Sequence, residues 1–151
     1  MFESRSTFET GQEIRDRTFR FACSVVRLCQ TLYDAGGVAK LLAPQLINCS
    51  TSVAGMLEEA RAAESRKDFI SKCSIGLKEC REAHVRLRIV ENCAIGPTHE
   101  RTLLIREASE LVAILSAIVR NAKRKLRCQR QAEGTGRGTR RDRSRAPIPD
   151  S

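Results

Sequence analysis

The sequence predicts an all-α protein, an antiparallel up-down-up-down four-helix bundle, from three observations. Apolar residues recur every three or four positions along four long stretches of the chain. A glycine pair, a Gly-Pro pair and a helix-capping pattern separate these stretches. No stretch of useful length alternates between apolar and polar residues, as a half-buried strand would. With 151 residues, the chain has room for one such core.

The first two helices are predicted on either side of Gly36 and Gly37. Over residues 11–33, the positions that share one helix face are Ile14, Thr18, Phe21, Val25, Leu28 and Leu32. Over residues 38–63, they are Leu42, Leu46, Cys49, Val53, Met56, Ala60 and Ala63. Because Pro44 has no N–H and clashes with the preceding turn, the second helix either begins near Pro44 or kinks there.

The third and fourth helices are predicted from their end signals. Ser65 followed by Asp68 matches the capping box that begins a helix, and Gly96-Pro97 ends the third helix. Its core face comprises Phe69, Cys73, Leu77, Cys80, His84 and Leu87. Thr98 is placed to cap the fourth helix. The core face of that helix comprises Leu104, Ala108, Leu111, Leu115, Ile118 and Ala122.

Three regions are expected along the chain: a flexible N-terminus (1–10), the bundle (11–127) and a disordered basic tail (128–151). From Cys128 onward, glycines, arginines and prolines replace the helical pattern, which leaves too little apolar surface to offset the entropy of ordering. The N-terminal residues are rich in charge, and the uncharged residues 41–57 include too many polar side chains for a membrane span. We therefore expect a cytoplasmic protein without a transmembrane segment.

Two of the helices carry a second apolar row beside the core face. The residues expected to form a subunit interface are Phe19 and Val26 in the first helix and Val112 and Val119 in the fourth. A bundle helix needs only one apolar stripe, so the additional rows indicate contact between copies of the chain. The alternative interpretation is a wider stripe buried within one bundle.

Positive charge is concentrated at the C-terminus. Residues 1–119 carry 16 basic and 15 acidic side chains, whereas residues 120–151 carry 11 and 3, within a net charge of +9. The helix dipole accounts for two or three cations at a helix C-terminus. The excess indicates a polyanion such as RNA or DNA, bound by counterion release. A tail that serves only solubility is the alternative.

Basic residues also form stripes at helical spacing in the body. The predicted nucleic-acid-binding residues are Arg120, Lys123, Arg124, Lys125, Arg127, Arg130, Arg137, Arg140 and Arg141, together with Lys78, Arg81 and Arg88 of the third helix. Lys67 continues the stripe of the third helix, and the first helix has a similar one in Arg17, Arg20 and Arg27. Ordinary solvated helix faces are the alternative interpretation of both stripes.

Signals for catalysis or cofactor binding are weak. The chain has seven cysteines, an odd number that argues against a disulfide framework and favours reduced thiols. Cys73, Cys80 and His84 share a helix face, as a cysteine-rich core or a soft-metal site would require. Glu-x-x-His motifs, Cys-x-x-Cys pairs and a phosphate-binding glycine loop after a strand are all absent. We expect no enzymatic activity, no cofactor and no bound metal.

Several short blocks resemble a known family. Residues 52–60 (SVAGMLEEA), 65–70 (SRKDFI), 75–79 (IGLKE) and 110–115 (ELVAIL) are similar to the four helix bundle proteins encoded in ribosomal RNA intervening sequences, a family that includes accessory variability proteins of diversity-generating retroelements. The similarity covers about residues 10–125.

The resemblance implies a bacterial, ring-shaped homopentamer without catalytic activity. Its accessory members bind nucleic acid and associate with a reverse transcriptase. We therefore expect a homo-oligomeric nucleic-acid-binding accessory protein. The alternative is a structural scaffold for protein–protein interaction without a nucleic-acid function.

Overall fold

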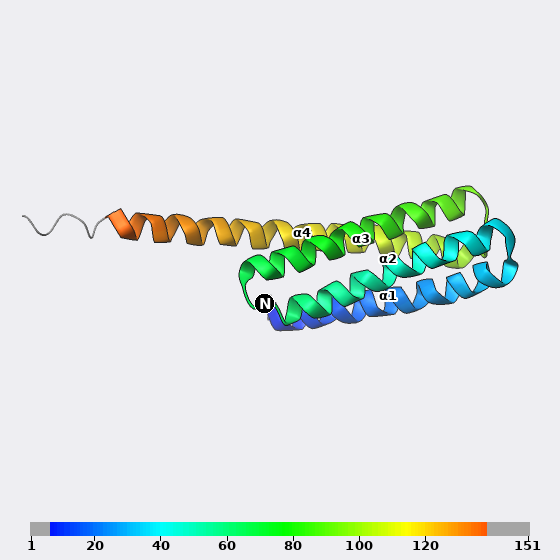
Figure 1. Cartoon of the computed structure of the whole chain (residues 1–151), viewed down its shortest axis with the longest axis horizontal. Helices are drawn as coiled ribbons and strands as arrows, with labels where there is room; N and C mark the ends of the chain where they lie inside the picture. The colour runs from blue at the N-terminus through cyan, green and yellow to red at the C-terminus, as the bar shows by residue number, and fades with distance from the viewer. Residues whose placement is uncertain (1–6, 139–151) are drawn as a thin grey trace, which may run out of the picture.

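The computed structural model describes residues 7–138, with side chains over 11–134, and folds them into four α-helices without a strand. The helices are α1 (Thr7–Ala35), α2 (Gly37–Arg61), α3 (Arg66–Asn92) and α4 (Thr98–Gly138). Each helix packs against the next one in the chain and runs antiparallel to it (Figure 1). The predicted all-α, up-down-up-down four-helix bundle is thereby confirmed.

The core follows the predicted rows closely in α1 and α2. All six positions predicted for α1 are buried, including the hydroxyl-bearing Thr18, whose Oγ1 donates to the carbonyl oxygen of Ile14 at 3.0 Å. In α2, Leu42 and Met56 are only half-buried, and Ala63 lies beyond the helix end. Thr18 tolerates full burial because the helix backbone accepts its hydrogen bond.

The core face of α3 is displaced by one residue from the prediction at two positions. Phe69 and His84 are half-buried, while their neighbours Ile70 and Ala83 are buried. Successive residues of an α-helix point about 100° apart, so the residue chosen at the edge of a wide stripe depends on how the helix is rotated. Because α3 packs between α2 and α4, its buried stripe is wide.

Local signals place the helix boundaries in the middle of the chain. Ser65 caps α3 as predicted: its side chain accepts a hydrogen bond from the backbone N–H of Asp68 at 3.1 Å. Gly36 and Gly37 both have positive φ, the backbone geometry that glycine tolerates best, and they separate α1 from α2. α2 begins at Gly37, so Pro44 lies within the helix, on its exposed side.

The end predicted for the fourth helix is wrong. Residues 128–138, which the sequence analysis assigned to a disordered tail, continue α4 as far as Gly138. Residues 128–133 contain Gln, Arg, Ala and Glu, which favour helix, and extending a formed helix requires no new nucleation. The remainder of the predicted tail, with Arg140 and Arg141, and residues 1–6 lie outside the described residues.

This extension leaves the bundle. Residues 127–134 of α4 are all exposed, and the orange end of the helix continues well past the connection between α2 and α3 (Figure 1). We call residues 128–138 the α4 projection. At 1.5 Å per residue it is about 16 Å long.

Candidate nucleic-acid interface

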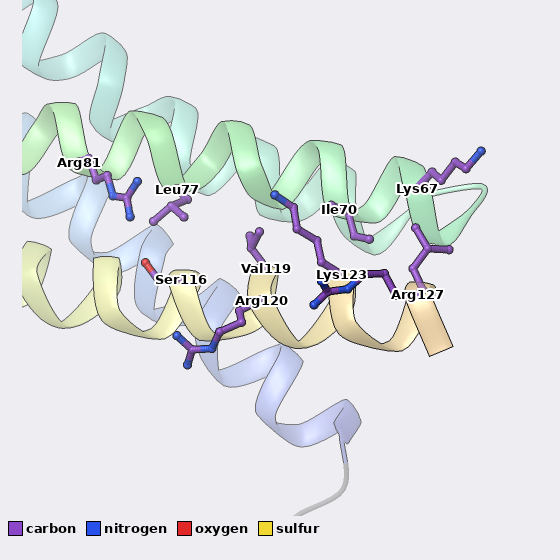
Figure 2. A pocket seen from close by; sticks show the side chains of 10 residues that line it. Lys67, Ile70, Leu77, Arg81, Ser116, Val119, Arg120, Lys123 and Arg127 are labelled. Atoms are coloured by element: carbon purple, nitrogen blue, oxygen red, sulfur yellow. The ribbon is translucent and has the colours of Figure 1, made fainter. Parts of the chain in front are cut away.

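The basic residues of α3 and α4 meet at a groove between these two helices. The groove has a volume of about 600 Å³ and lies beside the point where α4 leaves the bundle (Figures 1 and 2). Its cationic residues are Lys67 and Arg81 from α3 and Arg120, Lys123 and Arg127 from α4. Its apolar residues are Ile70, Leu77, Val119 and Leu126. The structure thus joins two basic segments that lie about 40 residues apart in the chain.

The apolar residues form the floor of the groove. Ile70 and Leu77 extend from α3 toward α4, and Val119 extends from α4 toward α3 (Figure 2). Lys67 points outward at one end of the groove (Figure 2). Charged side chains on either side of a largely apolar floor make the groove amphipathic.

The five cations of the groove have no carboxylate partner in the described part of the chain. The ion pairs there join other residues, such as Lys72 with Glu59 and Arg86 with Glu82. A cation without an internal counter-ion keeps its full charge available to an external anion. The groove is therefore a preformed concentration of positive charge.

Further predicted residues extend this surface along both helices. On α4, Arg124 and Arg130 are exposed and fall with Arg120, Lys123 and Arg127 within about 120° of the helix circumference. On α3, Lys78 and Arg88 are exposed and continue the row of Arg81. We call the following set the cationic strip: Lys67, Lys78, Arg81, Arg88, Arg120, Lys123, Arg124, Arg127 and Arg130.

Two of the other predicted cations stand apart from this strip. Lys125 is exposed but lies about 140° around α4 from Arg120, so it points in a different direction. Arg137 lies within the α4 projection, and its side chain is not among those described.

The basic stripe predicted on α1 is divided by the structure. The Nε and Nη2 of Arg17 donate to the carboxylate of Glu107 at 2.6 and 2.8 Å, and Nη2 also contacts Glu110. These hydrogen bonds to Glu107 and then Glu110 raise the pKa of the Arg17 guanidinium above its ordinary value. Arg20 and Arg27 remain exposed. Arg17 therefore stabilises the contact between α1 and α4, and its charge is already neutralised.

The residues predicted to form a subunit interface have different environments. Phe19 and Val26 are 63% and 41% exposed on α1, and Tyr33 continues their row at 50%. Val112 is half-buried against the core. Val119 is 6% exposed and belongs to the core, so its assignment to a subunit interface is wrong. The buried face of α4 includes Leu115 and Val119, whereas the predicted core residue Ile118 is only half-buried. The step of four residues from Leu115 to Val119 keeps this buried face directed toward α3.

The thiols are divided between core and surface. Cys29, Cys49, Cys73 and Cys80 are buried, whereas Cys93 and Cys128 are exposed. Burial raises the pKa of Cys29 and of Cys73 to about 11, and that of Cys80 to about 12.

The face shared by Cys73, Cys80 and His84 does not form a cluster of metal ligands. Burial, followed by the charge of Arg88, lowers the pKa of the half-buried His84. Among the side chains that the structure describes, those of residues 11–134, no three from His, Cys, Asp or Glu lie close enough to hold a metal ion.

Arg101 is a structural residue that the sequence analysis missed. It is buried, and its Nη1 donates to the carbonyl oxygens of Ile95 and Gly96 at 2.6 and 2.8 Å, which holds the connection between α3 and α4. The one available signal was an arginine in the first turn of a helix, where the helix dipole disfavours a cation. The groove itself was also missed, because its lining residues come from two helices.

Comparisons with known proteins agree with the fold. The model of the 23S rRNA-intervening sequence protein family matches residues 11–117. No curated protein matches the chain. A crystal structure of a protein with unknown function from the S23 ribosomal protein family of Bacteroides thetaiotaomicron is similar, with 25% identity and a TM-score of 0.66 over 73% of this chain and 97% of that one. Cations from Arg120 onward lie beyond the family match. None of the described helices has the length and apolar character needed to cross a bilayer.

Proposed function

Because the chain belongs to the 23S rRNA-intervening sequence protein family, we propose that it is a non-enzymatic, RNA- or DNA-binding accessory protein of the cytoplasm. One observation carries the proposal: cations from α3 and α4 converge at one groove, and none has a carboxylate partner in the described part of the chain. Phosphates replace their condensed counterions with these side chains, and the released ions favour binding. Binding of this kind depends on charge and is largely independent of base sequence.

Salt-dependent binding tests the proposal directly. Fluorescence anisotropy with labelled duplex and single-stranded oligonucleotides gives the slope of log K against log salt, about −0.9 for each phosphate contact on duplex DNA and about −0.7 on single strands. The Arg81→Glu/Lys123→Glu variant reverses two charges on the cationic strip. We expect it to bind at least about tenfold more weakly than the wild type and to give a shallower slope.

A matched variant separates a local effect from a change of net charge. Arg20→Glu/Arg27→Glu reverses two exposed charges on α1, and we expect a much smaller loss of affinity. Equal losses in the two variants would contradict a role for the cationic strip. Absence of salt-dependent binding in the wild type would contradict nucleic-acid binding altogether.

The proposed assembly is a homo-oligomer of five copies, as the resemblance to the family implies. The apolar row of Phe19, Val26 and Tyr33 supports this proposal, because large apolar side chains are exposed along one side of α1. Phe19→Ser should reduce the molar mass measured by light scattering to that of a monomer, and Gln30→Ser on the same helix should not. A wild-type monomer at micromolar concentration would contradict the proposal.

The same exposed row favours a second candidate function, a scaffold that holds partner proteins without binding nucleic acid. A wild-type protein that gives no salt-dependent shift of RNA or DNA, yet assembles through Phe19, would support the scaffold.

We propose that the protein binds nucleic acid as an accessory to a reverse transcriptase of a diversity-generating retroelement. The support is the resemblance of residues 52–60 and 110–115 to a family that includes accessory variability proteins, together with the basic end of α4. Co-purification of the tagged protein with a reverse transcriptase encoded by a neighbouring gene tests this setting. The absence of a reverse transcriptase gene near the gene that encodes this chain would contradict the proposed setting.

A further inference from the structure

The α4 projection stands clear of the other described helices on every side. Residues 127–134 are all exposed. At about 100° per residue these positions point in every direction around the helix, so the described part of the bundle covers none of its circumference there. In Figure 1 this orange segment extends beyond the other three helices. The end of α4 is therefore free to enter a groove of a binding partner, which a helix packed within the bundle cannot do.

The last turns of α4 carry cations on both sides of a narrow face. Arg124 and Lys125 are successive exposed residues, so they point about 100° apart. Between their directions, at spacings of seven and four residues, lie Asn121, Cys128 and Ala132, which are small, uncharged and exposed. The cationic strip lies on the Arg124 side of this face, and Lys125 lies on the other side. The face can therefore approach a surface closely while cations extend past it in two directions.

The major groove of B-form DNA matches this arrangement in width and in charge. The groove is about 12 Å wide, and an α-helix with its side chains is about 10–12 Å across, so a single helix fits into it. The phosphates of the two strands line the two sides of the groove, where cations on either side of the helix reach them. Charge alone would attract the helix to any phosphate backbone, whereas the match in width is particular to the major groove.

Two other kinds of nucleic acid fit the projection less well. The major groove of an A-form RNA duplex is deep and narrow, and protein side chains do not read it. Single strands are held by the stacking of their bases on aromatic side chains, and residues 120–151 include no aromatic residue. The chemistry of this part of α4 therefore favours duplex DNA over duplex RNA and over single strands.

We propose that the α4 projection lies in the major groove of duplex DNA, with Cys128 and Ala132 toward the base pairs. Arg124 and Lys125 then contact the phosphates of opposite strands. The proposal rests on the proposed nucleic-acid binding and deepens it, because it names the ligand as B-form DNA. It also gives a function to Lys125, which points away from the cationic strip.

Changes in the nucleic acid test entry into the groove with the protein unaltered. Fluorescence anisotropy compares the full chain on a labelled DNA duplex, on an RNA duplex of the same sequence, and on the DNA duplex with glucosylated 5-hydroxymethylcytosine in place of cytosine. The glucose occupies the major groove and leaves the phosphates unchanged. We expect the RNA duplex and the glucosylated DNA duplex each to bind at least about tenfold more weakly than the unmodified DNA duplex.

A proline in the projection tests whether the helix itself is required. Ala132→Pro removes a backbone N–H and clashes with the carbonyl oxygen of Cys128, which breaks the helix while every charge remains. We expect its affinity for the DNA duplex to fall at least about tenfold, and its affinity for the RNA duplex to stay within about twofold. Ala132→Ser, at the same exposed position, is the matched control and should affect neither affinity. The thermal midpoint should be unchanged in both variants, because Ala132 lies outside the bundle.

Replacement of Lys125 tests the contact with the second strand. Lys125→Gln removes a cation that does not belong to the cationic strip, so affinity for the DNA duplex should fall at least about threefold. Affinity for the RNA duplex should stay within about twofold. Arg20→Gln, which removes one exposed cation from α1, is the matched control and should change neither affinity by more than about twofold.

The outcomes distinguish this proposal from the proposed function. Equal affinity for the unmodified and the glucosylated DNA duplex would overturn entry into the major groove. Unchanged DNA affinity in Ala132→Pro, or equal losses on DNA and RNA duplexes, would show that the projection binds through charge alone. In either case this proposal would be wrong and nucleic-acid binding would stand. A wild-type protein that binds none of these duplexes and no single strand would refute both.

Discussion

α4 makes two contacts of opposite electrostatic character. Where it meets α1, Arg17 donates to Glu107 and Glu110, so positive and negative charges neutralise each other inside the protein. Where its C-terminal half meets α3, the cations beside the groove have no such carboxylate within the described residues. The first contact uses charge to hold two helices together, and the second leaves charge for a partner.

Buried and exposed side chains are distributed unevenly along α4. From Leu104 to Ala122 the helix contributes one buried residue every three or four positions to the core. Beyond Leu126, which is half-buried, the residues described through 134 are exposed. The buried row therefore ends near the point where the cations begin: Arg120 and Lys123 overlap its last turn, and Arg127 and Arg130 lie beyond it.

A substitution in the buried half of α4 should have the largest effect on folding. Leu111 is fully buried, so Leu111→Ala should lower the free energy of unfolding by about 2–5 kcal/mol, through lost burial and the cavity that remains. Urea unfolding followed by circular dichroism measures this change. At a temperature where the variant is folded, its salt slope for DNA should equal that of the wild type. A changed slope would mean that the two halves of α4 are not independent.

Alkaline pH should lower the stability of the fold through its buried thiols. Burial raises the pKa of Cys29, Cys73 and Cys80 above the value of 9.0 for a free thiol, so the folded state favours the protonated form. Their stabilising contribution is complete below pH 9 and is lost as the pH rises toward 11–12. At pH 10 the loss should be about 1 kcal/mol for each thiol, since one pKa unit corresponds to about 1.4 kcal/mol.

Unfolding measured at pH 8 and pH 10 tests this expectation. Cys80→Ala should lose less stability between the two pH values than the wild type does. An identical pH dependence in wild type and Cys80→Ala would show that other groups cause the alkaline loss.

Removal of residues 128–151 should weaken binding without unfolding the bundle. The deletion removes Arg130, Arg137, Arg140, Arg141, Arg143 and Arg145 but retains the cations from Arg120 to Arg127. We expect the affinity for duplex DNA to fall more than about tenfold near physiological salt, with a shallower salt slope. The thermal midpoint should not change, because residues 128–134 contribute no buried side chain. If the shortened protein binds duplex DNA with the affinity and salt slope of the full chain, binding depends entirely on α3 and the bundle portion of α4.

Loss of the internal ion pairs should have the smallest effect. Arg17 is partly exposed, so Arg17→Met should cost about 1 kcal/mol of folding stability and leave DNA affinity within about twofold of the wild type. Arg20→Met, which removes an exposed cation of the same helix, is the control and should cost less. A double-mutant cycle with Glu107→Gln measures the coupling energy. A marked loss of DNA binding in Arg17→Met would contradict the contrast between the two contacts of α4.

Local sequence determined the number, order and most ends of the helices. Gly36 and Gly37, the capping of α3 by Ser65 and the buried row of α1 could all be predicted, because each depends on the spacing of residues within one helix or turn. The excess of positive charge after residue 119 is likewise a property of composition. The helical state of the α4 projection was missed because apolar periodicity reports helices that pack, and the residues described in this part do not pack.

Tertiary structure alone decided which residues of each kind face a neighbour. Phe19 and Val119 both belong to second apolar rows, yet the first is exposed and the second is in the core. Arg17 and Arg81 both belong to basic stripes, yet one is paired internally and the other lines a groove. The physical reason is rotation: at about 100° per residue, a small turn of a helix about its axis exchanges a core position for a surface one. That rotation is set by the helices packed alongside, so the pattern within a single helix does not decide which residues at the edges of its apolar stripe are buried.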